Sequence, residues 1–431
     1  MNPTPATPPD GVAFLKAVTE LGQRRPVVTS RAIYNDRGIK LLEGGVVIDA
    51  TLYDRLVSHR LKTPLDECVD SEPAVNAAVL RETAQAIVAR QPFFAQMAPA
   101  GRIGSMVLEA IEAIPLPGPV AFQLTLARET RPGMFEHAVQ MALLCAHLVR
   151  EGGAPVHDIT VAASAGLLHD LGMLHIDPDL LASENRLRGD QRRPLYAHPL
   201  TGSMLADRFH AYPREVSRAI LEHHERLDGS GYPRGLAGGN LSPLGRLLSL
   251  AEVVTAMFDG ERLYPEQRVS LLLRLSPRRY DSTLVPSIHR LIRGVPAPLQ
   301  ASTVLVEEAL HRLRQQADLL LQFAAQVRGL GELQPAPAAV LASVEEQAAT
   351  LQRMLWNAGV TADQLGRLTE DDMGDVGLRI ELWALEQELH WQLRAVANQL
   401  ERRWRDAAAG AVLPAPLAAW LEQVRSFEQV V

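Results

Sequence analysis

The sequence predicts a mostly α-helical protein with a small α+β module near the N-terminus. Apolar residues recur at helical spacing from about residue 119 to 296, and the last ~135 residues are rich in Gln, Glu, Leu and Ala. Only residues 12–70 combine β-branched runs with glycine turns. A chain of 431 residues is long enough for two or three domains with hydrophobic cores of their own.

The N-terminal module, residues 12–70, carries alternating strand and turn signals. Strands are expected at Val27–Tyr34, Lys40–Leu42 and Val46–Ile48, with turns at Asn35–Gly38 and Gly44–Gly45. Asp49 is expected to cap a helix that carries Leu52, Leu56 and Leu61. These signals together predict a small α+β fold.

Five segments are predicted along the chain. They are a disordered tail over residues 1–11, the α+β module over 12–70, a helical linker over 71–118, a helical domain over 119–296 and a C-terminal helical region over 297–431. The linker is expected to break at Pro99–Gly101 and to stop at Pro115–Pro117. In the C-terminal region Pro335 and Pro337 separate two helical blocks, and Leu378–Asp406 predicts one long helix. Such helices favour a homodimer interface or regulatory packing, and a passive extension is the alternative.

Composition excludes several classes of protein. A net charge of −7 and an aromatic content of 5% disfavour nucleic-acid binding. No apolar run approaches the ~20 residues of a membrane helix, and the N-terminus lacks the features of a signal peptide. Cys68 and Cys145 are too few for a disulfide framework. We therefore expect a cytoplasmic protein without membrane insertion.

An ordered set of metal-ligand residue types runs through the helical domain: His137, His169, Asp170, His198, His223, His224 and Glu252. Imidazole and carboxylate groups bind divalent metals, and a carboxylate can bridge two ions. Glu252 stands in an otherwise apolar helix, where an acid is costly to bury unless it is paired or bound to metal. Singly, each residue is more often structural; as a set they indicate a polynuclear metal site that hydrolyses phosphate esters.

Local context refines this set. His198 precedes Pro199 at an expected helix start, and His223 ends a helix that begins near Pro213. Glu225 and Asp228 are open between orienting the histidines and capping the glycine-rich turn that follows. Ordinary core or surface roles are expected for His147, His157, His175, His210 and His289.

Residues ~130–296 resemble an HD-GYP domain, the subgroup of HD phosphohydrolases that hydrolyse cyclic di-GMP. The motifs that carry the resemblance are His169-Asp170-Leu171-Gly172, His198-Pro199, His223-His224-Glu225-Arg226, Asp228-Gly229-Ser230-Gly231-Tyr232-Pro233, Arg234-Gly235-Leu236 and Glu261-Arg262-Leu263-Tyr264. The region of resemblance covers about two fifths of the chain. The resemblance implies an HD-type helical core for this metal-dependent phosphohydrolase domain.

The resemblance also implies roles for individual residues. The seven residues of the ordered set would hold two, sometimes three, Fe or Mn ions, with Asp170 and His169 as the catalytic pair and Asp170 bridging the ions. A bridging hydroxide would attack phosphorus and give pGpG or GMP. Gly231, Tyr232 and Pro233 would border the substrate groove, and Arg262 would bind substrate.

The chain departs from the family pattern at several positions. Met173 and Ser183 stand where the family has lysines that contact substrate phosphates, and Glu252 replaces an Asp. Gly133 stands four residues before His137, where trinuclear members have an acidic ligand nearby. If positive charge replaces the two missing lysines, it is expected from the following loop, from Arg186, Arg188, Arg192 or Arg193.

Three functions remain open at this point. The first is a cyclic di-GMP phosphodiesterase of bacterial second-messenger signalling. The second is a weak or inactive signalling module that binds nucleotide or protein partners, favoured by the departures at Met173, Ser183 and Glu252. The third is an HD phosphohydrolase acting on another nucleotide, against which the Gly231-Tyr232-Pro233 element argues.

Overall fold

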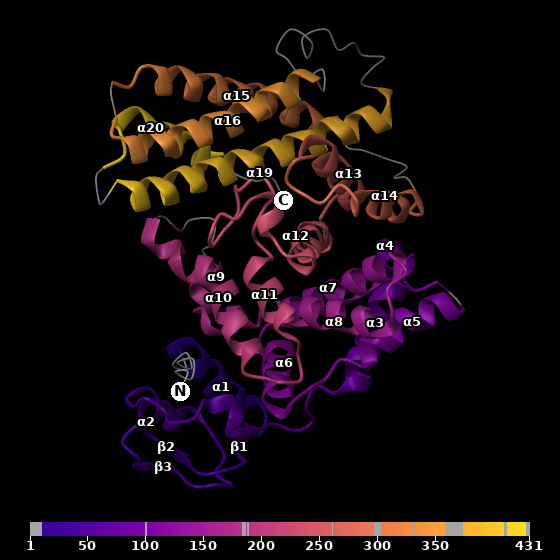
Figure 1. Ribbon diagram of the computed structural model, residues 1–431, viewed down its shortest axis with the longest axis vertical. Coiled ribbons are helices and arrows are strands. Elements are labelled where there is room, and N and C mark those ends of the chain that lie inside the picture. Colours follow the sequence, from indigo (N-terminus) through magenta and orange to yellow (C-terminus); the bar gives the residue numbers. More distant parts are fainter. Residues whose placement is uncertain are drawn as a thin grey trace. The chain divides into compact units, whose positions relative to one another are not determined.

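Helices make up most of the chain, as the sequence predicts, and the strands are short (Figure 1). This computed structural model describes residues 11–99, 101–182, 187, 189–260, 262–296, 303–331, 333–357, 374–408 and 412–427. Residues 1–10 of the expected disordered tail lie outside the described residues. The chain forms two compact units: the first comprises Met1–Gly260 and Arg278–Val295, and the second Glu261–Pro277 and Pro296–Val431.

The N-terminal module begins with helix α1 (Val12–Arg24). Its strands are β1 (Val28–Thr29), β2 (Ile33–Tyr34), β3 (Lys40–Leu42) and β4 (Val69–Asp70), which pair antiparallel as β1 with β4 and β2 with β3. Asp49 caps a 3₁₀ turn, Ala50–Leu52, which runs into helix α2 (Tyr53–Val57). The expectation that Leu61 lies in this helix is wrong, because the chain leaves it at Ser58 and pairs Leu61 with Asn35 in a β-bridge.

The remaining helices of the first unit are α3 (Ala77–Arg90), α4 (Pro92–Ala95), α5 (Arg102–Glu112), α6 (Gly118–Thr130), α7 (Pro132–Glu151), α8 (Val156–Leu168), α9 (Pro178–Ala182), α10 (Arg193–Asp207), α11 (Arg214–Glu222), α12 (Pro243–Thr255) and α14 (Val285–Arg293). The predicted break and stop fall where α5 and α6 begin. Two 3₁₀ turns matter for the site: η3 (Leu171–His175) and η7 (Ala256–Phe258).

Helix α7 lies at the centre of this unit. All of its residues from His137 to Leu148 are buried, because α5, α6, α8 and α12 pack around it. The predicted apolar stripe of Val139, Leu143, Leu144 and Leu148 is fully or almost fully buried. A polar side chain on α7 therefore projects into the protein interior.

The second unit is a bundle of α13 (Pro265–Leu275), α15 (Thr303–Arg328), α16 (Pro335–Asn357), α19 (Val376–Ala407) and α20 (Ala415–Ser426). Helices α15, α16 and α19 run alongside one another (Figure 1). The predicted long helix is present as α19, and Pro335 begins α16 as expected for a helix-starting proline. Helix α13 clusters with this bundle, whereas the sequence boundaries assign its residues to the 119–296 domain.

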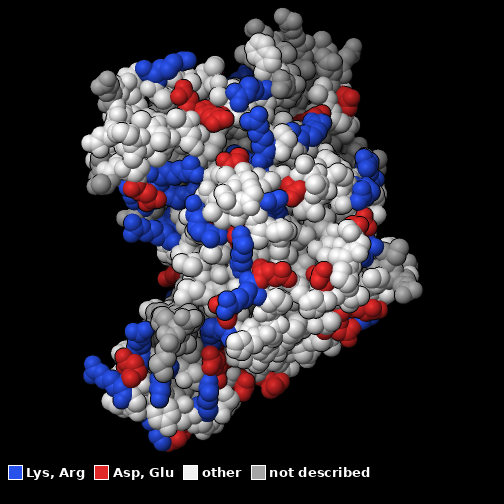
Figure 2. All heavy atoms as spheres, in the orientation of Figure 1, with Lys and Arg blue, Asp and Glu red and all other residues white. Residues whose placement is uncertain are grey.

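The surface and the thiols follow the composition. Figure 2 shows acidic and basic side chains interspersed on the visible face. Cys68 and Cys145 are buried and form no disulfide. Within the described ranges, every helix is too short or too polar to cross a membrane.

Candidate metal centre

The seven residues of the ordered set come together in the first unit as two neighbouring groups. One group contains Asp170, His198, His223 and His224, and the other His137, His169 and Glu252. Within each group one potential ligand atom per residue lies within 4.8 Å of the others. The residues come from the ends of α8 and α11 and from within α7, α10 and α12, so tertiary packing assembles the site.

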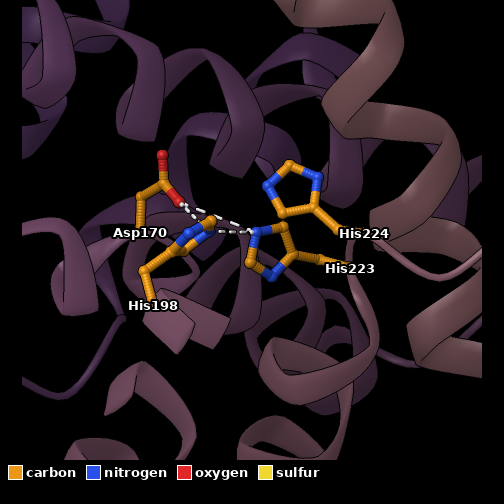
Figure 3. A group of neighbouring side chains, drawn as sticks. All are labelled: Asp170, His198, His223 and His224. Carbon is orange, nitrogen blue, oxygen red and sulfur yellow. Dashed lines mark hydrogen bonds and ion pairs between the residues drawn. The ribbon is translucent and has the colours of Figure 1, made fainter. Parts of the chain in front are cut away.

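Asp170 faces both groups. Its Oδ1 lies 3.2 Å from Nε2 of His198 and 3.6 Å from Nε2 of His223 (Figure 3). Its Oδ2 lies 3.4 Å from Nε2 of His169 in the other group. One carboxylate thus presents one oxygen to each group, which is the arrangement of a bridging ligand.

Glu252 joins the second group through a single oxygen. Its Oε2 lies 3.2 Å from Nε2 of His137 and 3.3 Å from Nε2 of His169. The acid that interrupts the apolar run of α12 therefore faces imidazoles, and its extra methylene relative to Asp does not remove it from the cluster.

Three of the histidines are oriented by main-chain carbonyls three residues earlier. Nδ1 of His169 lies 2.7 Å from the carbonyl oxygen of Gly166, and Nδ1 of His223 lies 2.6 Å from that of Ile220. Both histidines stand at helix C-termini, where the last carbonyls have no intrahelical donor. The carbonyl therefore accepts from Nδ1–H, and Nε2 is directed into the site.

His198 reaches the same arrangement by a different route. The expectation that it stands at a helix start is wrong, because α10 begins at Arg193 and carries Pro199 inside it. Pro199 has no N–H to donate to the carbonyl of Leu195, four residues earlier. That carbonyl accepts Nδ1–H of His198 instead. In the His-Pro pair the proline thus leaves a main-chain carbonyl in mid-helix without its usual donor, and the histidine side chain binds it.

Close main-chain approach positions the His-Asp segment. A Cβ at Gly172 would lie 2.2 Å from the carbonyl oxygen of His198 and 2.8 Å from the amide of Gly202. Any side chain there would push η3 away from α10 and separate Asp170 from His198. The glycine that follows His169-Asp170-Leu171 is therefore required by packing.

The Gly-Tyr-Pro loop is fixed to the end of α11. The Tyr232 amide donates to the carbonyl of His224, and the two rings stack with centroids 4.6 Å apart. A Cβ at Gly231 would lie 2.4 Å from Cα of Glu225, so only glycine permits this approach. The peptide bond between Tyr232 and Pro233 is cis.

Glu225 resolves one question that the sequence leaves open. It is fully buried, and its two oxygens accept the main-chain amides of Arg234 and Leu236 at 2.7 and 2.9 Å. Asp228 accepts the amide of Ser230 and pairs with Arg279. Both acids thus cap the loop that follows His223-His224.

Sequence reasoning missed two acids near the site. Glu222 is fully buried and accepts both the amide and the hydroxyl of Ser242, which caps α12. Asp259, just after η7, lies 3.1 Å from Nδ1 of His137. The position of Glu222 directly before His223-His224 is a local signal that could have been used; Asp259 gave none, since its partner is 122 residues away.

Burial and neighbouring charges shift the pKa values of the acids and histidines in the cluster. Burial opposes ionisation of Asp170, but His169 and its other imidazole partners hold the pKa of this carboxyl well below its usual range. Burial likewise opposes charge on His169, yet Asp170 and Glu252 raise its pKa to about 9. Burial lowers the pKa of His223 and, more strongly, that of His224. The acids are thus ionised and the latter two imidazoles neutral, the forms in which these groups bind metal.

Divalent transition metals fit this donor set. Imidazole nitrogens and carboxylate oxygens suit Fe, Mn and Zn. Nε2 of His169 and Oδ1 of Asp170 are buried and make no well-aligned hydrogen bond, although each lies within 3.4 Å of an oppositely charged group of the cluster. A cation placed between the groups would satisfy both atoms.

Of the two positions where the family has lysines, Met173 is described and carries no charge. Met173 packs against Ile176, Leu187 and Leu195. Ser183, Arg186 and Arg188 lie outside the described residues. Arg192 is buried and donates to the carbonyl of Leu187.

The remaining predicted residues are not members of either ligand group. Arg262 belongs to the second unit, and its role stays a prediction. His147, His157, His175, His210 and His289 belong to neither ligand group; His175, for example, stacks on Phe14 with ring centroids 4.7 Å apart.

Comparison with known proteins places this site in a family. Residues 122–284 match the model of the family described as HD domain. The chain is 34% identical over 123 residues to the 3′3′-cGAMP-specific phosphodiesterase 1 of Vibrio cholerae, covering 28% of this chain and 28% of the relative. It is 34% identical over 128 residues to the cyclic di-GMP phosphodiesterase PA4108 of Pseudomonas aeruginosa, covering 28% and 30%. It is 30% identical over 146 residues to the response regulator RpfG, a cyclic di-GMP phosphodiesterase of Xanthomonas campestris, covering 33% and 38%.

A solved structure of Bd1817, an HDG"Y"P protein from Bdellovibrio bacteriovorus, matches with a TM-score of 0.36 at 14% identity, over 62% of this chain and 94% of that chain. The matched part of the chain spans well under half the length of the curated relatives.

Residues 122–284 therefore form an HD domain, with the helical core and the His-Asp cluster described above. Within that region the chain carries the HD-GYP motifs at His169-Asp170 and Gly231-Tyr232-Pro233.

Proposed function

We propose that this protein is a metal-dependent phosphodiesterase that hydrolyses cyclic di-GMP to pGpG or GMP in bacterial second-messenger signalling. The observation that carries the proposal is Asp170, whose two oxygens face two separate ligand groups. The names of relatives over this region support a cyclic dinucleotide as the substrate class. Where those names divide between cyclic di-GMP and 3′3′-cGAMP, we propose cyclic di-GMP.

In this proposal the seven residues would hold two ions, Fe or Mn. Asp170, which presents an oxygen to each ligand group, and His169 would be the catalytic pair. Ions of this class lower the pKa of coordinated water and stabilise charge on phosphoryl oxygens. The protein's own contribution is orientation: the carbonyls of Gly166, Leu195 and Ile220 fix three imidazoles with Nε2 inward.

The substrate is proposed to lie against the Gly231-Tyr232-Pro233 loop. Tyr232 covers one face of His224, so this loop adjoins the first ligand group. Glu225 holds the main chain of Arg234 and Leu236 just beyond Pro233. A loop anchored in this way keeps a fixed surface beside the ions.

The direct test is turnover by the full chain loaded with Fe²⁺ or Mn²⁺ without oxygen. Cyclic di-GMP and 3′3′-cGAMP are supplied in separate reactions, and linear products are separated by chromatography. We expect pGpG or GMP from cyclic di-GMP, at a rate that Asp170→Asn lowers on the order of 10³-fold. Absence of product from cyclic di-GMP with either metal would refute the proposal, and turnover of 3′3′-cGAMP alone would correct the substrate.

A second candidate is a binding module with little or no hydrolysis. The packing of Met173 among apolar side chains favours it, because that position provides no cation for a phosphate. Each lost charge-assisted hydrogen bond weakens phosphate binding by roughly 1.5–3 kcal/mol. Equilibrium dialysis of metal-loaded protein with cyclic di-GMP separates the candidates, since this one predicts binding without product. Met173→Lys should then raise turnover strongly, and unchanged turnover would remove this explanation.

We also propose that the protein acts in the cytoplasm and forms a homodimer through its C-terminal helices, with signalling proteins as further partners. Support for a dimer role is the length of α19, which runs from Val376 to Ala407. Sedimentation of the full chain over a range of concentrations tests the dimer. A monomer mass at all concentrations would contradict it.

A further inference from the structure

His137 differs from its neighbouring ligands in how its second nitrogen is held. His169, His198 and His223 each place Nδ1 on a main-chain carbonyl three residues earlier. His137 stands near the beginning of α7, a helix of 20 residues, where the carbonyls of its own turn are engaged in intrahelical hydrogen bonds. Its Nδ1 must find an acceptor from another part of the chain.

That acceptor is Asp259. Its Oδ1 lies 3.1 Å from Nδ1 of His137, while Nε2 of the same ring lies 3.2 Å from Glu252. The two ring nitrogens thus have two carboxylates, one on each side. Asp259 belongs to neither ligand group, so its carboxylate stands behind the imidazole.

The segment that carries Asp259 is held firmly. It follows η7, which continues directly from α12 and therefore from Glu252. Phe258 stacks on Phe93 with ring centroids 4.3 Å apart and meets Phe94 edge-on at 5.6 Å. These contacts hold the main chain beside Asp259, whose side chain is 39% exposed and reaches His137.

We infer that Asp259 is a positioning residue for His137, and this inference rests on the proposed metal-dependent function. Its carboxylate accepts Nδ1–H, selects the tautomer with a free Nε2 and makes that nitrogen a stronger ligand. It takes the place that a main-chain carbonyl has behind His169, His198 and His223. The group of His137, His169 and Glu252 therefore depends on a residue outside the family motifs described above.

The test measures Mn²⁺ binding by the full chain, with a chromophoric chelator as competitor. Asp259→Ala should weaken binding of one ion by roughly 10- to 100-fold and leave the other ion unaffected. Asp259→Asn keeps an acceptor but loses the charge and should fall between Ala and wild type, and Asp259→Glu should recover part of the affinity. His137→Ala should lose the same ion, with no further loss in the double variant.

Glu151→Ala is the matched control, since Glu151 is a partly exposed carboxylate at the far end of α7 that pairs with Arg290. It should bind Mn²⁺ as wild type does, and circular dichroism should show every variant folded. Wild-type affinity in Asp259→Ala would overturn this inference alone. A wild-type chain that binds no Mn²⁺ or Fe²⁺ would overturn the proposed function and this inference together.

Discussion

The two units each bury a cluster of charged and polar side chains, and the clusters differ in the partners of their buried acids. In the second unit Glu386 on α19 is 2% exposed. Its Oε1 lies 2.9 Å from the amide nitrogen of Gln316 and 3.1 Å from Nε of Arg312, and its Oε2 accepts from Gln387. In the first unit, Oε2 of Glu252 lies 3.2 Å from Nε2 of His137 and 3.3 Å from Nε2 of His169, so its partners are imidazoles.

The difference separates a structural acid from a candidate ligand. Both Glu386 and Glu252 follow apolar residues in a helix, so the sequence gives each the same warning of a costly buried charge. Glu386 meets side-chain amides and one guanidinium, which donate hydrogen bonds and do not bind metal cations. Glu252 meets imidazole nitrogens, which bind either a proton or a metal.

The largest effect that this comparison predicts is for Asp170→Asn. The amide offers one oxygen in place of two, so it cannot serve both ligand groups. Loss of several kcal/mol of transition-state stabilisation corresponds to a fall in cyclic di-GMP turnover on the order of 10³-fold. Glu386→Gln is the control and should keep wild-type turnover. Equal losses in both variants would break the comparison.

Glu386→Ala should act on stability instead. It removes the buried partner of Arg312, whose guanidinium then keeps only the more exposed Glu308 of its two carboxylates, and this costs roughly 1.5–3 kcal/mol of unfolding free energy. Urea unfolding of the metal-free protein measures this change. Glu381→Ala removes an exposed partner of Arg274 from the same helix and should cost less than about 1 kcal/mol. Similar values for the two variants would mean that the buried network contributes nothing special.

His390 gives the second unit a pH dependence of its own. Burial, followed by the charges of Arg394 and Arg312, lowers its pKa to about 4. In the unfolded chain it titrates near 6.5, so between these values the unfolded state binds the extra proton. Stability should therefore fall as the pH drops from 6.5 to 4, by up to roughly 3 kcal/mol from this residue.

Urea unfolding at several pH values measures this dependence, and His390→Leu removes the titrating group. The variant should show a shallower loss of stability below pH 6.5 and an unchanged slope above it. An identical slope in variant and wild type would show that His390 does not titrate as its burial implies.

The smallest effect is expected for Glu225→Gln, which concerns the loop and not the ions. The amide keeps one acceptor oxygen, so either Arg234 or Leu236 loses its partner. An unpaired buried amide costs roughly 1–3 kcal/mol. We expect KM for cyclic di-GMP to rise about 10-fold with unchanged Mn²⁺ content. Loss of Mn²⁺ would show that this loop also supports the ligands.

What the sequence predicts here follows the range of each interaction. The helical class and the break before Arg102 depend on local periodicity and on proline, and the structure agrees. The seven residue types of the metal set are visible in the motifs, and the structure brings them together; their role as ligands stays a prediction. The expectation of a helix start at Pro199 is wrong. A proline normally marks such a start, but here the His198 side chain uses the carbonyl that Pro199 leaves without a donor.

The rest depends on contacts between distant segments. Asp259 meets His137 across 122 residues, and no local pattern announces that pairing. Glu225 could orient a histidine or cap a turn with equal plausibility, until the positions of Arg234 and Leu236 are known. Helix α13 joins the second unit through long-range packing against α19, which periodicity does not encode.

The most direct test of the central claim is a crystal structure of the Mn²⁺-loaded protein with an anomalous difference map. The account predicts two peaks that share Asp170: one beside His198, His223 and His224, and one beside His137, His169 and Glu252. A map without a peak at these residues, or with a single peak that Asp170 does not contact, would contradict it.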